Sequence, residues 1–370
     1  MEERKNANEI LMHCCNCDCE MSIGEAVYFE GEAYCRDCFE EETTICIQCG
    51  SRIFEDDSEG DDDTPLCGHC FERYYNRCDE CGRLILQEEE YFDEYEDRTL
   101  CYHCMKQGAI QNYSYKPDPI FYGTDSNLYL GVELEIDDGD GSHEDAKEIL
   151  RIANAEASHI YIKHDGSLDS GFEIVTHPMT LQYHMEVMPW KEVMEKALNM
   201  GYRSHKSATC GLHCHVNRTF FGEDYEQQEE NIGKVLFLVE KYWEELLRFS
   251  RRTKGQMSQW AARYGFKEKP NQVMDQAKNS ILGRYACVNL QNWHTIEFRM
   301  WRGTLKYNTL IATLQMVENL CKTARAYSEE ELQNRSWWRF VSEISETELI
   351  TYLKERRLYI NEPVEMEEEI

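Results

Sequence analysis

From about residue 128 onward, hydrophobic and polar positions follow two different periods along the chain. Strict alternation of apolar and polar residues is typical of half-buried strands, and apolar residues three or four positions apart are typical of amphipathic helices. The pattern predicts strands at 128–136, 160–163, 172–176, 212–217, 285–290 and 295–301. It predicts helices at 142–157 (capped by Ser142), 181–200, 225–249 and 308–327. This order favours a mixed α+β domain with a largely antiparallel sheet.

Four of these strands carry ionisable side chains on one face. These residues are Glu133, Glu135, Glu173, His213, His215, Glu297 and Arg299, with Asn217 following the histidines. Any one such row is most often a solvated strand face. Carboxylates, imidazoles and arginine on several strands together instead suggest one shared face, where a hard cation such as Mg²⁺ or Mn²⁺ lies beside an anion.

The first 104 residues follow a different pattern, a cysteine repeat with a period of 32 residues. Each repeat contains two Cys-x-x-Cys pairs, and the twelve cysteines are Cys14, Cys17, Cys35, Cys38, Cys46, Cys49, Cys67, Cys70, Cys78, Cys81, Cys101 and Cys104. Four sulfur ligands per repeat are what a tetrahedral structural zinc ion requires. We expect about three zinc sites, one per repeat, although the spacing also permits pairs shared between neighbouring repeats. The repeats resemble single halves of LIM-type or treble-clef fingers, as in Gly31-Glu-Ala-Tyr-Cys-Arg-Asp-Cys38.

Charge limits the partners of this cysteine-rich part. Residues 1–120 contain 30 Asp and Glu against 10 Lys and Arg, a net charge of −20 out of −31 for the whole chain. Such a surface repels phosphate backbones, which argues against nucleic-acid binding. A closed zinc site also lacks the open coordination position that catalysis needs. We therefore expect this module to dock a protein or peptide substrate with a basic surface.

Several features indicate a cytoplasmic protein with no membrane contact. The N-terminal residues show no apolar stretch of the kind found in signal peptides, and the longest strongly apolar run, 235–239, is too short to span a bilayer. Eighteen cysteines without a secretory signal favour zinc in a reducing compartment over disulfides. We expect zinc repeats at 1–110, a linker at 111–125 containing Pro117 and Pro119, and a catalytic domain at 126–370.

Six motifs in order within residues 128–305 resemble the amidoligase family, which belongs to the carboxylate–amine ligases related to glutamine synthetase and glutamate–cysteine ligase. They are Gly131-Val-Glu-Leu-Glu135, Asp165-Gly-Ser-Leu168, Glu173-Ile-Val-Thr-His-Pro178, Cys210-Gly-Leu-His-Cys-His-Val216, Arg284-Tyr-x-x-Val-Asn-Leu290 and Thr295-Ile-Glu-Phe-Arg-Met-Trp-Arg-Gly-Thr-Leu305. The resemblance implies a glutamine-synthetase-like fold. It also implies a reaction in which ATP phosphorylates a carboxylate and an amine then displaces phosphate to form an amide or isopeptide bond.

The resemblance also implies roles for single residues. The magnesium ligands would be Glu133, Glu135, Glu173, His213 and Glu297. Residues near the nucleotide or acyl group would be His215, Asn217, Arg284, Asn289, Arg299 and Arg302. Asp165 would belong to the catalytic set, although its Gly-Ser turn alone can explain an aspartate, and His177 would shape the substrate pocket.

Two other functions compete with the ligase. One is a zinc-scaffold adaptor whose ligase domain is inactive, and the other is a metal-dependent hydrolase. Charged residues gathered on one face are costly without a metal, which disfavours the adaptor. The chain contains no His-Glu-x-x-His motif, which disfavours the hydrolase.

Overall fold

The computed structural model describes residues 11–93, 97–207 and 209–359. Its internal contacts divide the chain into two compact units, Met1–Gly108 and Ala109–Ile370. We describe each unit by itself. None of the helices in the described ranges combines the length and apolarity that a bilayer crossing requires.

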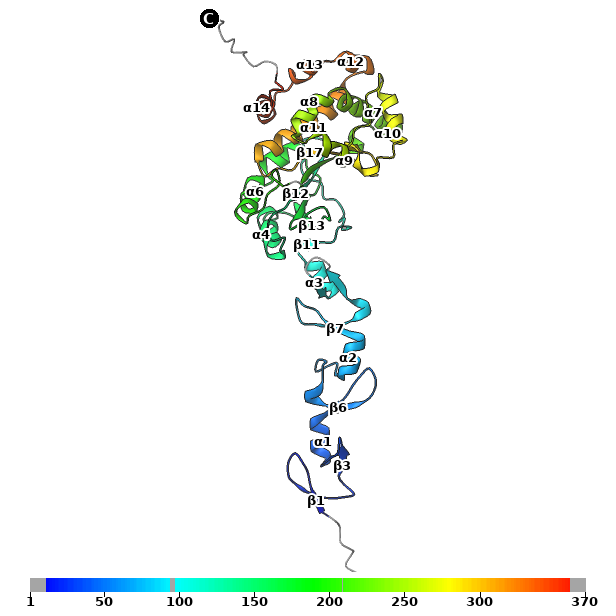
Figure 1. The fold of residues 1–370 in the computed structure, drawn as a ribbon, viewed down its shortest axis with the longest axis vertical. Helices are drawn as coiled ribbons and strands as arrows, with labels where there is room; N and C mark the ends of the chain where they lie inside the picture. The colour runs from blue at the N-terminus through cyan, green and yellow to red at the C-terminus, as the bar shows by residue number, and fades with distance from the viewer. Residues whose placement is uncertain (1–10, 94–96, 208, 360–370) are drawn as a thin grey trace, which may run out of the picture. The chain divides into compact units, whose positions relative to one another are not determined.

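The N-terminal unit consists of three similar repeats of short antiparallel hairpins followed by a short helix (Figure 1). The first contains β1 (Leu11–His13), β2 (Glu20–Ser22), β3 (Val27–Phe29), β4 (Glu32–Tyr34) and α1 (Arg36–Glu42). The second contains β5 (Thr43–Ile45), β6 (Arg52–Phe54), η1 (Glu55–Asp57) and α2 (Gly68–Tyr74). The third contains β7 (Tyr75–Arg77), β8 (Leu84–Leu86), η2 (Gln87–Glu89), β9 (Tyr91–Asp93), β10 (Arg98–Leu100) and α3 (Tyr102–Gln107). In each repeat the third cysteine is the N-cap of the helix.

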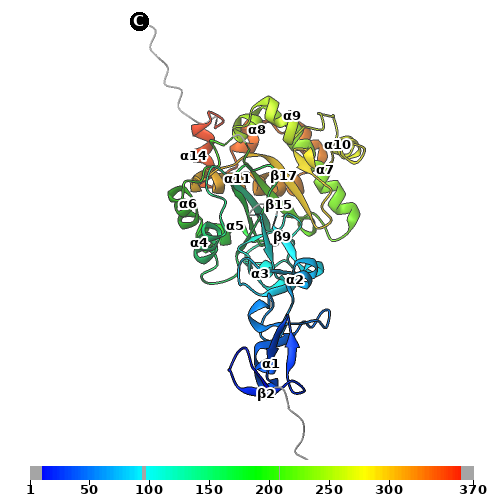
Figure 2. The ribbon, with the colours of Figure 1, turned by 60° about the horizontal axis from the view of Figure 1, so that its bottom comes forward.

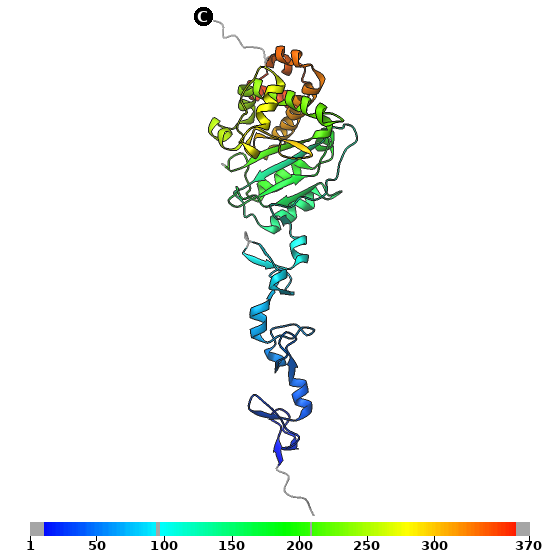
Figure 3. The ribbon, with the colours of Figure 1, turned by 90° about the vertical axis from the view of Figure 1, so that its right-hand side faces the viewer.

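The C-terminal unit is built on one seven-stranded sheet (Figure 3). Its strands are β11 (Ile110–Gln111), β12 (Leu130–Ile136), β13 (Ile160–Lys163), β14 (Phe172–Thr176), β15 (Gly211–Asn217), β16 (Val288–Asn289) and β17 (Thr295–Arg302). Their order is β11-β13-β14-β12-β15-β17-β16, and only the β11–β13 pair is parallel. This confirms the predicted mixed α+β class with a mostly antiparallel sheet.

Helices precede, separate and follow these strands. They are α4 (His143–Ala153), α5 (Leu181–Glu186), α6 (Trp190–Asn199), α7 (Tyr225–Lys241), α8 (Trp243–Ser250), α9 (Lys254–Trp260), α10 (Pro270–Lys278), α11 (Tyr307–Ala326), α12 (Glu329–Asn334), α13 (Trp337–Val341) and α14 (Thr347–Glu355), with the 3₁₀ turns η3 (Arg218–Phe220) and η4 (Gly283–Tyr285). Figure 2 shows α11 beside β15 and β17 of the sheet.

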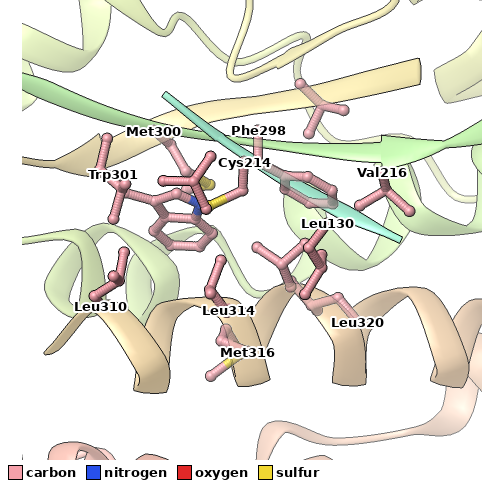
Figure 4. Close-up of a cluster of buried hydrophobic side chains, with 14 of the residues drawn as sticks. Leu130, Cys214, Val216, Phe298, Met300, Trp301, Leu310, Leu314, Met316 and Leu320 are labelled. Atoms are coloured by element: carbon pink, nitrogen blue, oxygen red, sulfur yellow. The ribbon is translucent and has the colours of Figure 1, made fainter. Parts of the chain in front are cut away.

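The hydrophobic core lies between one face of the sheet and α11 (Figure 4). Cys214 and Val216 of β15 and Phe298 and Met300 of β17 are fully buried there. Because strand side chains alternate between faces, burial of these residues turns their neighbours to the opposite face. Burying each large apolar side chain contributes roughly 1.5–3 kcal/mol, so the core fixes the strand register.

Three predicted elements are shorter or broken. The helix expected at 181–200 is interrupted before Pro189, which is the N-cap of α6 and has no N–H to continue α5. The helix expected at 225–249 divides at Tyr242, whose hydroxyl donates to the Arg335 carbonyl at 2.9 Å. The strand expected at 285–290 is only Val288–Asn289, because Tyr285 belongs to η4 and Ala286 forms a bridge with Ala262 instead.

Two boundaries also differ from the sequence prediction. Helix α4 ends at Ala153 rather than 157, because the Asn154 side chain exchanges two 2.9 Å hydrogen bonds with the backbone of Ile160. The segment expected as a linker, 111–125, is joined to the C-terminal unit: Gln111 belongs to β11, and the Tyr122 N–H donates to Pro178 O at 2.9 Å.

Candidate functional site

The three cysteine groups have the geometry of zinc sites. In each repeat the four sulfur atoms lie within 4.8 Å of one another, which groups the cysteines repeat by repeat and excludes sharing of pairs between repeats. The Cys17–Cys35, Cys49–Cys67 and Cys81–Cys101 sulfur pairs are each 3.8 Å apart. A tetrahedral zinc with Zn–S bonds of about 2.3 Å separates its sulfurs by about 3.8 Å, so these groups fit the metal.

Backbone N–H groups also stabilise the thiolate form of one cysteine in each repeat. The N–H groups of Cys17 and Cys35 lower the pKa of the Cys14 thiol to about 6. Burial acts against the thiolate at Cys46 and Cys78, but neighbouring N–H groups still lower the pKa of each to about 6. Because the thiolate is the form that binds metal, these bonds favour zinc at neutral pH.

In the C-terminal unit, strand register brings the predicted site residues together on the sheet face opposite the core. Glu135 is paired with Glu173, and Glu133 is paired with His213. Across β15, β17 and β16, His215 is paired with Glu297 and Glu297 with Asn289. These pairings bring seven residues from five strands onto one polar face.

His213 stands at the centre of this group, which we call the carboxylate–histidine cluster (Glu133, Glu135, His213, His215 and Glu297). Its Nδ1 lies 3.2 Å from Glu133 Oε2 and 3.6 Å from Glu297 Oε1, and its Nε2 lies 3.7 Å from Glu135 Oε1. His215 Nε2 lies 3.3 Å from Glu133 Oε1. The side chain of Glu133 is 20% exposed and that of Glu297 is 4% exposed, so this is not a solvated strand face.

The cluster combines two buried carboxylates (Glu135 and Glu297) and the partly buried Glu133 with two imidazoles. Burial favours the neutral acid at Glu133, but His215 and His213 hold its pKa well below the usual value. Burial, aided by the charge of Asp165 and opposed by His213, raises the pKa of Glu135. At His215 burial favours the neutral ring, yet Glu133 and Glu297 raise its pKa. The carboxylates of the cluster therefore favour positive charge next to them, either on the histidines or on a bound cation.

These residues fit a divalent cation. Glu133, His215 and Glu297 each offer a ligand atom within 4.8 Å of the others. His215 Nδ1 bonds the Thr295 hydroxyl at 3.1 Å, while its Nε2 is buried without a hydrogen bond. Neighbouring ligands of an octahedral Mg²⁺ at about 2.1 Å lie roughly 3 Å apart, close to the separations seen. A histidine with one ring nitrogen fixed by a hydrogen bond and the other facing a carboxylate is suited to bind a metal ion together with that carboxylate.

Gly211 and Arg252 belong to the site but were not found from the sequence. A Cβ atom at Gly211 would lie 2.5 Å from Arg252 Nη2, 3.0 Å from His213 Nε2 and 3.2 Å from Glu135 Oε2. Glycine is thus the residue that lets these three groups meet. Arg252 follows α8 and belongs to none of the six motifs, and its Nε–H bond to Trp301 O, at 3.1 Å, holds it against β17.

Lys163 and Tyr113 were also not identified from the sequence as residues of the site. Lys163 Nζ lies 3.0 Å from Glu173 Oε2 in a pair whose side chains are 9% and 2% exposed. It lies 5.6 Å from the centroid of the Tyr113 ring, and the Tyr113 hydroxyl in turn accepts a hydrogen bond from Arg284. Lys163 shares a strand face with Tyr161, a signal that the 160–163 strand pattern could have given. Tyr113 lies in the segment that we expected to be a linker.

The remaining predicted residues divide into two sets. Arg299 Nη1 lies 2.5 Å from Glu297 Oε1, and Asn289 Nδ2 donates to Glu297 Oε2 at 2.8 Å, so both orient that carboxylate. By contrast, Asp165 accepts from the Ser167 N–H at 2.7 Å within its own turn. Asn217 accepts from the Tyr129 N–H at 2.8 Å, and His177 Nδ1 accepts from the Ile120 N–H at 3.2 Å. These bonds hold backbone segments in place.

Comparison with known protein families finds the same family that the sequence motifs resemble. Residues 140–321 match a protein family described as "Putative amidoligase enzyme". The match includes Glu173, His213, His215, Glu297 and Arg299, and it begins just after the strand that carries Glu133 and Glu135. No curated protein is similar enough to the chain to count as a match.

Proposed function

Since residues 140–321 form an amidoligase-family domain, we propose that the protein is an ATP- and Mg²⁺-dependent ligase that joins a carboxylate to an amine. ATP would phosphorylate the carboxylate, giving ADP and an acyl phosphate. The amine nitrogen would then attack the acyl carbon, inorganic phosphate would leave, and a proton would be lost from nitrogen. The observation that carries this proposal is the convergence of five ionisable residues, three buried and two partly buried, from β12, β15 and β17 on one sheet face.

The chain's residues would share the work as follows. Glu133, His215 and Glu297 would hold the divalent ion, with His213 and Glu135 beside them. Bound Mg²⁺ would offset the charge of the triphosphate and of the transferring phosphoryl group. Arg299 and Asn289 would keep the Glu297 carboxylate oriented, and the guanidinium of Arg299, 15% exposed, could also contact the phosphate or the acyl group. Such a site would be glutamine-synthetase-like in its chemistry.

The N-terminal unit would select the substrate rather than take part in the reaction. Its cysteine groups are closed four-sulfur sites, and its acidic surface suits a partner with a basic docking surface. A protein or peptide is therefore the proposed substrate. Residues 109–370 produced alone should turn over ATP but lose reaction with this partner, and an equal reaction rate with and without residues 1–108 would contradict the docking role.

The decisive test is chemical. Cell proteins incubated with the purified protein, ATP and Mg²⁺ should yield, by mass spectrometry, adducts lighter by one water than the sum of their two components. Glu133→Gln, Glu297→Gln and His213→Ala should each lower the yield on the order of a hundredfold or more. Glu88→Gln, an exposed position of η2, is the matched control. Full ligation by folded Glu297→Gln would exclude the mechanism, and ATP-independent partner binding with no product would favour the adaptor.

A further inference from the structure

A second feature of the C-terminal unit is a cavity of about 540 Å³ rich in arginine. We call it the arginine pocket. Its lining consists of Arg248, Arg251, Arg252, Arg302, Arg356, His205, Glu244, Glu245, Leu247 and Leu358. These residues come from α8 and the turn after it, the end of β17, the end of α14 and the loop before β15. Five guanidinium groups around one cavity are more than packing requires.

Within the described residues, the positive charges of the pocket outnumber the negative ones. Among the described residues, none of the five arginines forms an ion pair, and Glu244 pairs instead with Lys254 at 3.9 Å. Their hydrogen bonds go to backbone carbonyls: Arg356 Nη2 donates to Arg248 O at 3.0 Å, and Arg252 Nε donates to Trp301 O at 3.1 Å. Arg302 Nε is buried without a hydrogen bond. With five positive and two negative side chains, the lining has a net charge of +3.

The same positive charges act on His205, which also lines the pocket. Burial, together with the charges of Arg251, Arg302 and Arg356, lowers the pKa of His205 to about 4. Like charges held together at partly buried positions cost free energy unless an anion joins them.

Arg252 connects this pocket with the carboxylate–histidine cluster. Its Nη2 approaches the space over Gly211 in which His213 Nε2 and Glu135 Oε2 also meet. We propose that the arginine pocket binds a substrate through at least two anionic groups, phosphates or carboxylates, and presents it to the neighbouring cluster. Planar guanidinium groups bind both kinds of anion through paired hydrogen bonds. The assignment as a substrate site rests on the proposed ligase function, whereas anion binding by the pocket does not.

Calorimetric titration of the full chain without added nucleotide or Mg²⁺ tests the proposal. Inorganic tripolyphosphate represents the phosphate source, and a tri-glutamate peptide represents the carboxylate source. At least one should bind, and Arg248→Gln and Arg251→Gln should each weaken that binding about tenfold or more, the effect of losing one charge-assisted hydrogen bond. The probe that binds more tightly shows whether the pocket prefers phosphate or carboxylate groups. Arg151→Gln, on the exposed face of α4, is the matched control.

The outcomes separate this inference from the ligase proposal. Binding of neither probe, or equal weakening by Arg151→Gln and Arg248→Gln, would overturn the anion pocket. Arg251 has a left-handed backbone with φ 63°, so Arg251→Gln can fail to fold for reasons unrelated to the pocket. Arg248 is exposed, and its guanidinium forms no ion pair within the described residues. Arg248→Gln therefore tests the pocket even if Arg251→Gln does not fold. If the protein shows no ligase activity but still binds a probe through Arg248, the anion-binding pocket is supported and the proposed reaction is rejected.

Discussion

Lys163 Nζ lies 3.0 Å from Glu173 Oε2, and this ammonium group stands where the sequence led us to expect a magnesium ion. Burial alone would lower the pKa of Lys163, yet Glu173 and Glu133 raise it. The sheet face therefore has two parts: a carboxylate–histidine cluster able to take a metal, and a carboxylate that already has its own cation.

We expect Lys163→Met to leave Glu173 buried without a counter-charge and to destabilise the protein by about 3 kcal/mol. In the variant, Mn²⁺ or Mg²⁺ should raise the melting temperature more than in the parent chain, because a metal can now neutralise Glu173. Thermal melts with and without metal measure both effects. Lys196→Met, which breaks the half-exposed Lys196–Glu148 pair, should cost less than about 1 kcal/mol. Equal melting temperatures of Lys163→Met and Lys196→Met would contradict the role of Lys163 as the counter-charge of Glu173.

Gly211→Ala should damage the site without damaging the fold. The added methyl group would press on Arg252, His213 and Glu135 at 2.5–3.2 Å, so these groups must move apart. We expect divalent-metal affinity and ligation to fall at least tenfold, the scale of losing an oriented metal partner. Gly255→Ala is the control, because a Cβ atom there meets only the Thr253 hydroxyl at 3.9 Å. Unchanged metal affinity in Gly211→Ala would show that the three groups need not converge.

Zinc removal should unfold only the N-terminal unit. All seven tryptophans lie between residues 190 and 338, so their fluorescence reports on the C-terminal unit alone. Chelation should release about three zinc ions per chain and abolish the far-UV signal of the repeats while tryptophan emission stays constant. Cys14→Ser should release one ion more readily, whereas Cys15→Ser, at an exposed position outside the four-sulfur group, should not. Equal zinc content in Cys14→Ser and the parent chain would contradict the assignment of the first site.

Acid should destabilise the C-terminal unit through His184. This ring is fully buried, with Nε2 bonded to Leu130 O at 3.0 Å and Nδ1 accepting from Trp190 Nε1–H at 3.2 Å. Burial lowers its pKa from 6.5 to about 4, although the Leu130 carbonyl opposes the shift. Between these pH values the unfolded chain binds a proton that the folded chain does not. The free energy of unfolding should therefore fall as the pH drops below about 6.5, by about 3 kcal/mol in all near pH 4.

Urea titrations followed by tryptophan fluorescence at pH 7.5 and 5.0 measure this loss. His184→Gln should be less stable at pH 7.5, since it loses the fitted ring, but its stability should change less between the two pH values. His13→Gln, in the N-terminal unit, should retain the full dependence of the parent chain. A His184→Gln variant with the same pH dependence as the parent would assign the acid sensitivity to other groups.

The sequence by itself determined the features that depend on local spacing. The 32-residue cysteine period placed all twelve ligands in groups that the structure closes, since a hairpin and a helix N-cap set their separation locally. Alternation along β12, β15 and β17 assigned Glu133, His213 and Glu297 to the polar face, because successive side chains of a strand point to opposite faces. Most strands of the C-terminal unit follow directly from the same periodicity.

Only the tertiary structure decided which charges meet. Strand order and register bring Lys163 to Glu173, and a glycine at 211 admits Arg252 from the turn after α8. No local pattern marks Arg252, and strand alternation gives only the face on which Lys163 lies, since the partner of each lies on another strand. The same holds for Tyr113 in the expected linker and for the break at Tyr242, where contacts with distant segments override the local hydrophobic period. Local periodicity fixes the face on which a side chain lies, whereas its partners depend on how distant segments of the chain pack together.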